Sequence, residues 1–534
     1  MEALDWIVIG AFALALIGII VWVVKQKQND SADYFLGGRD ATWIAIGASI
    51  FASNIGSEHL IGLAGAGASS GMAMAHWEIQ GWMILILGWV FVPFYTRSMV
   101  YTMPEFLERR YNPQSRTILS VISLVSYVLT KVAVTVYAGG LVFQQVFGIK
   151  ELWGIDFFWI AAIGLVVLTA LYTIFGGMKS VLYTSVLQTP ILLLGSLIIL
   201  VLGFKELGGW DEMMRVCGAV TVNDYGDTMT NLIRSNDDAN FPWLGALIGS
   251  AIIGFWYWCT DQFIVQRVLS GKNEMEARRG TIFGAYLKLT PVFLFLIPGM
   301  VAFAMQKHGI TVNGETFTMS SADAAFPTLV AKLLPAGFKG LVVCGILAAL
   351  MSSLASLFNS SAMLFTIDFY KKYRPKASEK TLLYVGRVAT VVVVVLGILW
   401  IPVMKSVGSV LYNYLQDVQS VLAPGIAAAF LLGICSKKAT PKGGMWGLIA
   451  GFIIGITRLG AKVYYTSGAT FSDSWFKYLF YAAFATLLGT ALGIGIGMYL
   501  LPQIIWNAYG IMFSLPEMII DFRWGIALQA MGAL

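Results

Sequence analysis

Charged residues are scarce in this chain. Only 12% of its 534 residues are Asp, Glu, Lys or Arg, whereas 58% are hydrophobic, and the mean hydropathy is +0.75. Soluble globular domains carry about 25% charged residues, so this composition excludes a soluble protein for most of the chain. We therefore predict an integral membrane protein whose surroundings are the lipid bilayer.

Cysteine and histidine are also few, and neither is clustered. The sequence contains four cysteines: Cys217, Cys259, Cys344 and Cys435. Their scattered positions indicate neither a disulfide framework nor a metal site. The three histidines are His59, His76 and His308. With no nucleophile motif, metal-ligand spacing or phosphate loop beside them, we do not expect an enzyme.

Long apolar runs dominate what is present. Windows of about 20 apolar residues give thirteen candidate spans and a shorter fourteenth between Pro502 and Pro516. They are 6–24, 42–68, 70–95, 117–147, 155–174, 181–203, 242–266, 281–304, 338–370, 382–404, 407–433, 442–461, 476–500 and 502–516. The first has no basic residue before it and no cleavage site after it, so we expect a retained helix and not a signal peptide.

The basic residues predict an orientation. The formal net charge is +6, but Lys and Arg are spread over loops, which favours positive-inside bias over a nucleic-acid partner. With the N-terminus outside, the cytoplasmic loops hold most of them, including Arg109, Arg267 and Lys371. We expect a multi-pass protein of the plasma membrane, or of the inner membrane in a bacterium. Nothing in the sequence calls for an obligate protein partner.

Two predicted spans are interrupted by polar residues. The stretch FASNIGSEHLIG, residues 51–62, places Asn, Glu and His in the middle of an apolar segment, and 242–266 carries Thr260, Asp261 and Gln262 among several glycines. Two broken helices five spans apart predict an inverted repeat of five plus five helices. The alternative is glycine-rich helix packing, which does not require the polar residues of 51–62.

This organisation predicts one membrane domain, 1–534, with four parts. They are an N-terminal extra helix at 5–27, a first repeat at 40–204, a second, inverted repeat at 240–436 and C-terminal extra helices at 437–534. In such an architecture the binding sites lie at mid-membrane, between the two broken helices.

A stripe of hydroxyl groups follows the segment 345–370. Ala349, Ser352 and Ser353 stand at i, i+3 and i+4 and share one helix face, and Ser356 and Ser360 extend it. Such a stripe is either a packing seam between helices or a set of oxygen ligands for Na+, completed by free carbonyls of a broken helix. Spacing alone leaves both open.

Ionisable and aromatic residues inside spans are further candidates. Lys288 precedes Pro291 in an apolar run, and Glu78 is a matching opposite charge. An intramembrane lysine indicates function, although a structural pair or an extended side chain reaching the interface would also explain it. Gln416 adds an amide that a structural hydrogen bond would equally explain. The aromatic residues, each also typical of membrane proteins, are Trp77, Trp256, Tyr257, Trp258 and Tyr412.

Four long motifs carry a family resemblance. DYFLGGRD, SIFASNIGSEHLIGLAGAGASSG, WYWCTDQFIVQRVLSGK and ALMSSLASLFNSSAMLFTIDFYKKY together resemble the sodium/solute symporter family, and within it the sodium/glucose cotransporter branch. The similarity runs from about residue 5 to about 440. It implies an all-α polytopic membrane protein with a five-plus-five inverted-repeat, LeuT-like core, flanked by extra helices to give 13–14 transmembrane helices.

The resemblance also implies roles for individual residues. Na+ would be held at Ala52, Ile55, Ala349, Ser352 and Ser353. The sugar would contact Asn54, His59, Glu78, Lys288 and Gln416. An inner gate falls on Tyr257 with Trp258 beside it, and the outer gate on Leu63, Trp77 and Tyr412.

The sequence departs from the family pattern at three places. Ser185, in YTSVLQT, stands where many relatives have an aspartate associated with a second sodium site, and Ala355 lacks a hydroxyl often present there. The resemblance then implies one Na+ per sugar. Gly254 stands where the family usually has Asn or Thr, and Ile79 where it usually has Trp. The identity of the sugar is therefore open between glucose, galactose, another hexose and an inositol.

Two rival functions remain from the sequence. The first is a sodium symporter for another solute, such as inositol, sialic acid, proline or a monocarboxylate, although the pairing of Lys288 with Glu78 favours a neutral ligand. The second is a sugar sensor or leaky channel that keeps the fold without coupled transport.

Overall fold

The computed structural model describes residues 1–26, 28–56, 58–238, 241–407, 411–436 and 439–466. Seven helices in these ranges are long and apolar enough to cross a membrane: Ala3–Val24, Glu58–Ser98, Phe157–Leu207, Trp243–Thr260, Glu274–His308, Phe338–Tyr373 and Glu379–Ile401. This confirms a helical multi-pass protein. The predicted spans at 476–500 and 502–516 lie outside the described residues.

The elements follow the predicted spans closely. The first part contains α1 (Ala3–Val24), α2 (Ser31–Leu36), η1 (Gly37–Arg39), α3 (Trp43–Asn54), η2 (Glu58–Leu63), α4 (Ala64–Ser70), η3 (Gly71–Ala75), α5 (His76–Ile79), η4 (Gln80–Trp82), α6 (Met83–Ile86), η5 (Leu87–Phe91) and α7 (Val92–Ser98). It continues with α8 (Met103–Arg110), α9 (Pro113–Ser126), η6 (Tyr127–Val132), α10 (Ala133–Phe147), α11 (Phe157–Leu207) and α12 (Trp210–Gly218).

The second part repeats the pattern of interrupted helices. It contains α13 (Trp243–Gly254), η7 (Phe255–Thr260), α14 (Gln262–Leu269), α15 (Glu274–Lys288), η8 (Val292–Leu296), α16 (Ile297–His308), η9 (Ala322–Ala324), α17 (Ala325–Leu333), α18 (Phe338–Met363), η10 (Leu364–Tyr370), α19 (Lys371–Tyr373), α20 (Glu379–Val407), α21 (Leu411–Cys435) and α22 (Pro441–Thr466).

Strand structure is confined, in the described ranges, to two short antiparallel hairpins. β1 (Glu151–Leu152) pairs with β2 (Ile155–Asp156), and β3 (Thr311–Val312) pairs with β4 (Glu315–Thr316). Each hairpin has only two residues a strand, too short to form a core of its own. Helix packing therefore holds the described chain together.

Helix α11 joins two predicted spans, 155–174 and 181–203. They meet at Gly177, whose φ of 56° and ψ of −150° are not helical. A side chain there would collide with the carbonyl oxygen of Tyr34, so the position needs glycine both for its backbone angles and for the close approach. The predicted boundary is confirmed, with a sharp break where a loop was expected.

Both predicted helix breaks are present. Helix α3 ends at Asn54, and Ile55 adopts an extended ψ of 105° before the chain becomes helical again at Glu58. The second break is at Asp261, with a ψ of 127°, between η7 and α14. Backbone groups on either side of such breaks lack intrahelical partners, so they are available to ligands.

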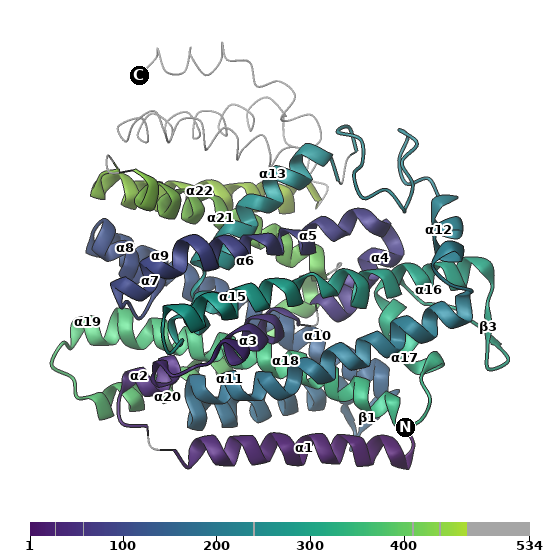
Figure 1. Ribbon diagram of the computed structural model, residues 1–534, viewed down its shortest axis with the longest axis horizontal. Helices are drawn as coiled ribbons and strands as arrows, with labels where there is room; N and C mark the ends of the chain where they lie inside the picture. The colour runs from purple at the N-terminus through teal and green to yellow at the C-terminus, as the bar shows by residue number, and fades with distance from the viewer. Residues whose placement is uncertain (27, 57, 239–240, 408–410, 437–438, 467–534) are drawn as a thin grey trace, which may run out of the picture. The chain divides into compact units, whose positions relative to one another are not determined.

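The described chain divides into two compact units. The first comprises Met1–Thr102, Ser123–Leu232 and Gln262–Leu415, and the second comprises Met103–Ile122, Ile233–Asp261 and the segment from Gln416 onwards. In the first unit α18 packs along α11, and α3 packs against α15 and α11 (Figure 1). A Cβ on Gly299 would strike the Ala64 carbonyl, so α16 and α4 approach with backbones nearly touching.

The second unit is organised around the end of α21. The Arg110 guanidinium donates hydrogen bonds to the carbonyl oxygens of Gly433, Ser436 and Ala439, at 2.5, 2.7 and 3.2 Å. The Tyr111 hydroxyl donates to the carbonyl of Ala429 at 2.8 Å. The Gly433 carbonyl lies in the last turn of α21, where carbonyls have no intrahelical partner, so Arg110 satisfies it and joins the helix end to the residues that follow.

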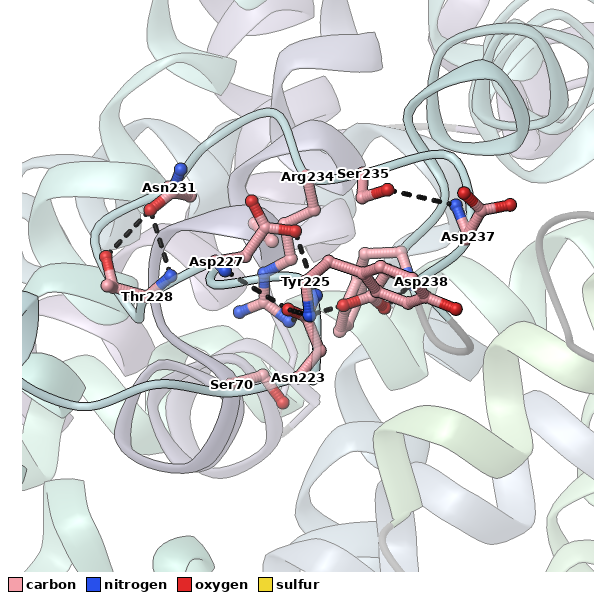
Figure 2. A network of polar contacts seen from close by, with 12 residues as sticks. Ser70, Asn223, Tyr225, Asp227, Thr228, Asn231, Arg234, Ser235, Asp237 and Asp238 are labelled. Atoms are coloured by element: carbon pink, nitrogen blue, oxygen red, sulfur yellow. Dashed lines mark hydrogen bonds and ion pairs between the residues drawn. The ribbon is translucent and has the colours of Figure 1, made fainter.

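The long loop after α12 is held by local polar contacts (Figure 2). Within the first unit, the Asn223 side chain accepts from the backbone N–H of Tyr225 and of Asp227, each at 3.1 Å. Within the second, Arg234 lies 3.7 Å from the Asp238 carboxylate. Contacts of this kind fix turn geometry.

Candidate functional site

The hydroxyl stripe of α18 faces the break in α3. The Ser353 hydroxyl donates to the carbonyl oxygen of Ser53 at 2.8 Å and lies 3.3 Å from that of Ile55. Both carbonyls belong to the end of α3, where the helical hydrogen bonding stops. The structure therefore brings Ser353 and Ile55 together, two of the five residues predicted to hold Na+.

The other predicted sodium ligands lie on the same two helices. Ala52 and Ala349 are each 1% exposed, and Ser352 is equally buried. The Ser352 hydroxyl lies 3.4 Å from that of Ser53 and 3.2 Å from that of Ser185. Hydroxyl and carbonyl oxygens are hard ligands suited to Na+. No cluster of three or more His, Cys, Asp or Glu with metal-binding geometry occurs in the described ranges.

Two residues missed by the sequence analysis lie at the centre of this cluster. Ser53 contacts Ser356 through its hydroxyl at 2.7 Å. Arg267 donates to Ser49 at 3.2 Å and to Ser53 at 3.1 and 2.8 Å. Arg267 was counted among loop cations, yet it is 1% exposed. Arg267 directly follows the predicted span 242–266, in the run IVQRVLSGK, and this position could have indicated a buried side chain.

Ser185 occupies the same hydroxyl cluster from α11. Its hydroxyl donates to the Val181 carbonyl at 2.6 Å and lies 3.4 Å from the Ser49 hydroxyl. Thr189, one turn further, donates to the Ala48 carbonyl at 3.1 Å. The residue that departs from the family pattern therefore lies beside the predicted sodium ligands, in a group of neutral oxygens.

Lys288 and Glu78 form a buried ion pair. The Lys288 ammonium lies 2.5 Å from the Glu78 carboxylate, and the two side chains are 3% and 2% exposed. The same ammonium lies 3.1 Å from Nε2 of His59, which is 3.3 Å from the other carboxylate oxygen of Glu78. Three of the predicted sugar contacts therefore form one group, contributed by η2, α5 and α15.

The remaining predicted contacts are placed as follows. Asn54 is buried at the end of α3, next in the chain to the carbonyls that face Ser353, while Leu63 and Trp77 are buried in η2 and α5. Tyr257 and Trp258 lie in η7 of the second unit, with ring centroids 4.8 Å apart at 85°. Tyr412 and Gln416 lie in α21, and their side chains are outside the described part.

Gly56 lies within the first helix break, between Ile55 and Glu58. Gly56 is not among the glycines with positive φ. A Cβ on Gly56 would collide with both carboxylate oxygens of Glu58. A side chain at this position would therefore displace the Glu58 carboxylate, which folds back over the break.

Known proteins that are similar to this chain include sodium-coupled transporters. The model of the sodium:solute symporter family matches residues 34–451. Sodium/glucose cotransporter 1 of Ovis aries is 37% identical over 96% of this chain and 81% of its own length. Sodium/myo-inositol cotransporter 2 of Homo sapiens is 38% identical over 86% of this chain and 70% of its own length.

A solved structure supports the fold. The substrate-bound outward-open state of a Na+-coupled sialic acid symporter superposes with a TM-score of 0.72 at 22% identity, covering 85% of this chain and 91% of that one. The predicted all-α, LeuT-like inverted-repeat architecture is confirmed. The matched relatives are transporters and not enzymes, and Na+ is the co-transported ion. The chain belongs to the sodium:solute symporter family and is a sodium-coupled solute symporter of the membrane.

Proposed function

We propose that this protein imports a neutral sugar, a hexose such as glucose or galactose, together with one Na+. The observation that carries the proposal is the pairing of two sites within one unit. Ser353 hydrogen-bonds to two carbonyls at the end of α3, and His59, in the helical segment that follows the break, contacts Lys288 and Glu78. One broken helix therefore serves both ligands.

The sugar site is suited to a neutral polyol. The carboxylate of Glu78 only accepts hydrogen bonds, the ammonium of Lys288 only donates them, and a sugar hydroxyl does both. The ion pair also balances its own charge, so an anionic ligand would leave the carboxylate without compensation. We propose that Asn54, Gln416, Tyr257 and Trp258 complete this site.

Transport follows alternating access in this proposal. Na+ at Ala52, Ile55, Ala349, Ser352 and Ser353 stabilises the broken helix and so orders Asn54 and His59 for the sugar. Binding of both ligands then shifts the equilibrium towards the form open to the cytoplasm. Leu63, Trp77 and Tyr412 form the outer gate and Tyr257 the inner gate.

The energetics set the limit of accumulation. One positive charge moving down a potential of about 100 mV releases roughly 2.3 kcal/mol, and a tenfold sodium gradient adds about 1.4 kcal/mol. A single Na+ would then sustain a sugar gradient of roughly a few hundredfold. Ser185 and Ala355 support this stoichiometry, because Ser185 brings a neutral hydroxyl and no carboxylate to the cluster, and Ala355 brings no hydroxyl.

The proposal includes the position in the cell and the internal repeats. We propose the plasma membrane, with the N-terminus outside, on the distribution of Lys and Arg. We also propose repeats at 40–204 and 240–436, since each contains one broken helix, at Ile55 and at Asp261. The extra helices flank them at 5–27 and 437–534.

Myo-inositol is the second candidate substrate. The human sodium/myo-inositol cotransporter 2 is as similar to this chain as the glucose cotransporters are, and a cyclic polyol offers the same hydroxyl chemistry. A sugar sensor is the alternative without transport.

Uptake by proteoliposomes under an imposed sodium gradient tests the proposal. We expect labelled glucose or galactose to accumulate, and competition by inositol, sialic acid, proline and monocarboxylates to rank the alternatives. A protein that binds sugar without sodium-dependent accumulation would be a sensor, and preferential uptake of proline or an anion would contradict the proposed substrate.

A further inference from the structure

Glu58 has no role in the site described above, yet it borders that site. It is the first residue of η2, and its side chain is 15% exposed. One carboxylate oxygen, Oε1, lies 3.8 Å from Nδ1 of His59, while the other edge of the same ring faces Glu78 and Lys288. His59 therefore stands between two carboxylates.

The second oxygen of Glu58 lacks a partner. Oε2 is buried and makes no hydrogen bond with any described residue. A buried charged acceptor left unsatisfied is costly, more so than a neutral one. The side chain nevertheless reaches this position, and Gly56 leaves the space for it, since a Cβ there would collide with Oε2. Oε2 is therefore an acceptor that could take a hydrogen bond from a ligand.

The surrounding charges indicate what kind of donor fits. His59, Lys288 and Lys131 are the basic residues whose charges act on Glu58. The Lys131 ammonium lies 4.8 Å from the Phe263 ring centroid and 5.1 Å from that of Tyr127. The two ammonium groups would repel a cationic ligand. A hydroxyl group supplies a donor without adding charge.

We propose that Glu58 is a further specificity-determining residue, whose Oε2 accepts a hydrogen bond from one hydroxyl of the transported neutral sugar. This inference rests on the proposed function and deepens it. Substrate recognition would then use an acceptor on each side of the His59 ring, Glu58 on one and Glu78 on the other. A substrate that lacks the hydroxyl facing Glu58 would leave Oε2 unsatisfied and be rejected.

Single-deoxy analogues of the sugar test this contact. Sodium-driven uptake of D-glucose, or of D-galactose if the wild type prefers it, is compared with uptake of monodeoxy derivatives that each lack one hydroxyl. Wild type, Glu58→Ala and Glu58→Gln are measured, with Glu212→Gln on α12, outside the proposed sites, as a carboxylate control. If the effect of removing one sugar hydroxyl depends on the residue at position 58, the two groups interact directly, and this comparison separates that contact from other effects of the substitution.

We expect one deoxy analogue to lose about 10- to 100-fold in kcat/KM with wild type, the range for a hydrogen bond to a charged group. That loss should shrink to within about threefold in Glu58→Ala and be intermediate in Glu58→Gln, because a neutral acceptor is weaker. Removal of any other sugar hydroxyl should lower kcat/KM by the same factor in every variant. Glu212→Gln should behave as wild type with all analogues.

An identical pattern of losses in wild type and Glu58→Ala would overturn the proposal. A fall in kcat/KM of the same size for glucose and for every analogue in Glu58→Ala would also overturn it, because that result is expected if Glu58 only orients His59. Thermal unfolding of each purified variant checks that it is folded, and Glu58→Gln, nearly isosteric, provides the comparison if the alanine variant is not. A wild type that transports no sugar at all would instead refute the proposed function.

Discussion

The Lys288 ammonium lies 2.5 Å from the Glu78 carboxylate, and both side chains are almost fully buried in membrane-spanning helices. Neither charge is isolated, because each compensates the other, and His59 contacts both. Charged groups are expensive in such surroundings unless they are paired. The pair therefore fixes the relative position of α5 and α15.

Replacing one partner of this pair should destabilise the protein more than replacing both. Lys288→Met or Glu78→Gln alone leaves an uncompensated buried group, and we expect a loss of roughly 3–5 kcal/mol in the free energy of unfolding. The double variant should recover a large part of it. Unfolding in detergent, arranged as a double-mutant cycle, measures this, and strictly additive losses would contradict the ion pair.

Ser353→Ala should weaken Na+ binding. The hydroxyl is within 2.8 and 3.3 Å of two carbonyls at the end of α3, so its removal deletes one predicted oxygen ligand. We expect the sodium concentration for half-maximal uptake to rise about tenfold, corresponding to roughly 1.4 kcal/mol, with sugar binding retained at high sodium. Ser361→Ala is the matched control, since the Ser361 hydroxyl is buried on the same helix without a described partner. Unchanged sodium dependence in Ser353→Ala would refute the site.

Arg267→Lys should lower both stability and sodium affinity while keeping the charge. The guanidinium reaches Ser49 and Ser53 together, and a single ammonium cannot reproduce that forked geometry. We expect a loss of about 1–3 kcal/mol in the free energy of unfolding. Arg215→Lys, at an exposed ion pair on α12, should have little effect. Equal behaviour of the two variants would show that Arg267 acts only through its charge.

Asp5→Ala should affect stability and leave transport intact. The Asp5 carboxylate accepts from the backbone N–H groups of Gly337 and Gly340 at 2.7 and 2.8 Å, which caps α18 and joins it to α1. Loss of such a cap costs about 1–2 kcal/mol. Thermal unfolding should detect this decrease, with Asp211→Ala as an exposed control. A changed sodium dependence of uptake would mean that α1 also influences the ion site.

Periodicity and apolar length were sufficient to predict the helices and both breaks, because a membrane span requires a long apolar run and polar residues at its centre need a reason. The pairing of Lys288 with Glu78 was also predicted, since opposite charges in hydrocarbon must be compensated. Both predictions follow from the high free-energy cost of polar and unpaired charged groups in the bilayer, and such groups can be read directly from the sequence.

The contacts around Ser53 could not be predicted in this way. Serine is common in membrane helices, and nothing in FASNIGSEHLIG distinguishes Ser53 from Ser57 as the partner of Arg267. Arg267 itself stands near a span boundary, where a loop position is equally compatible with the sequence. The position of the Glu58 carboxylate over Gly56 depends on the three-dimensional path of the break, which the sequence pattern does not determine.

The ratio of sodium flux to sugar flux in proteoliposomes tests the central claim most directly. Both fluxes are measured in the same vesicles, with labelled hexose and labelled sodium, under an imposed sodium gradient and a fixed membrane potential. One Na+ bound beside Ser353, with Ser185 contributing only a neutral hydroxyl, predicts concentrative sugar uptake at a ratio near one. A ratio near two, or sugar uptake that ignores the sodium gradient, would contradict the account.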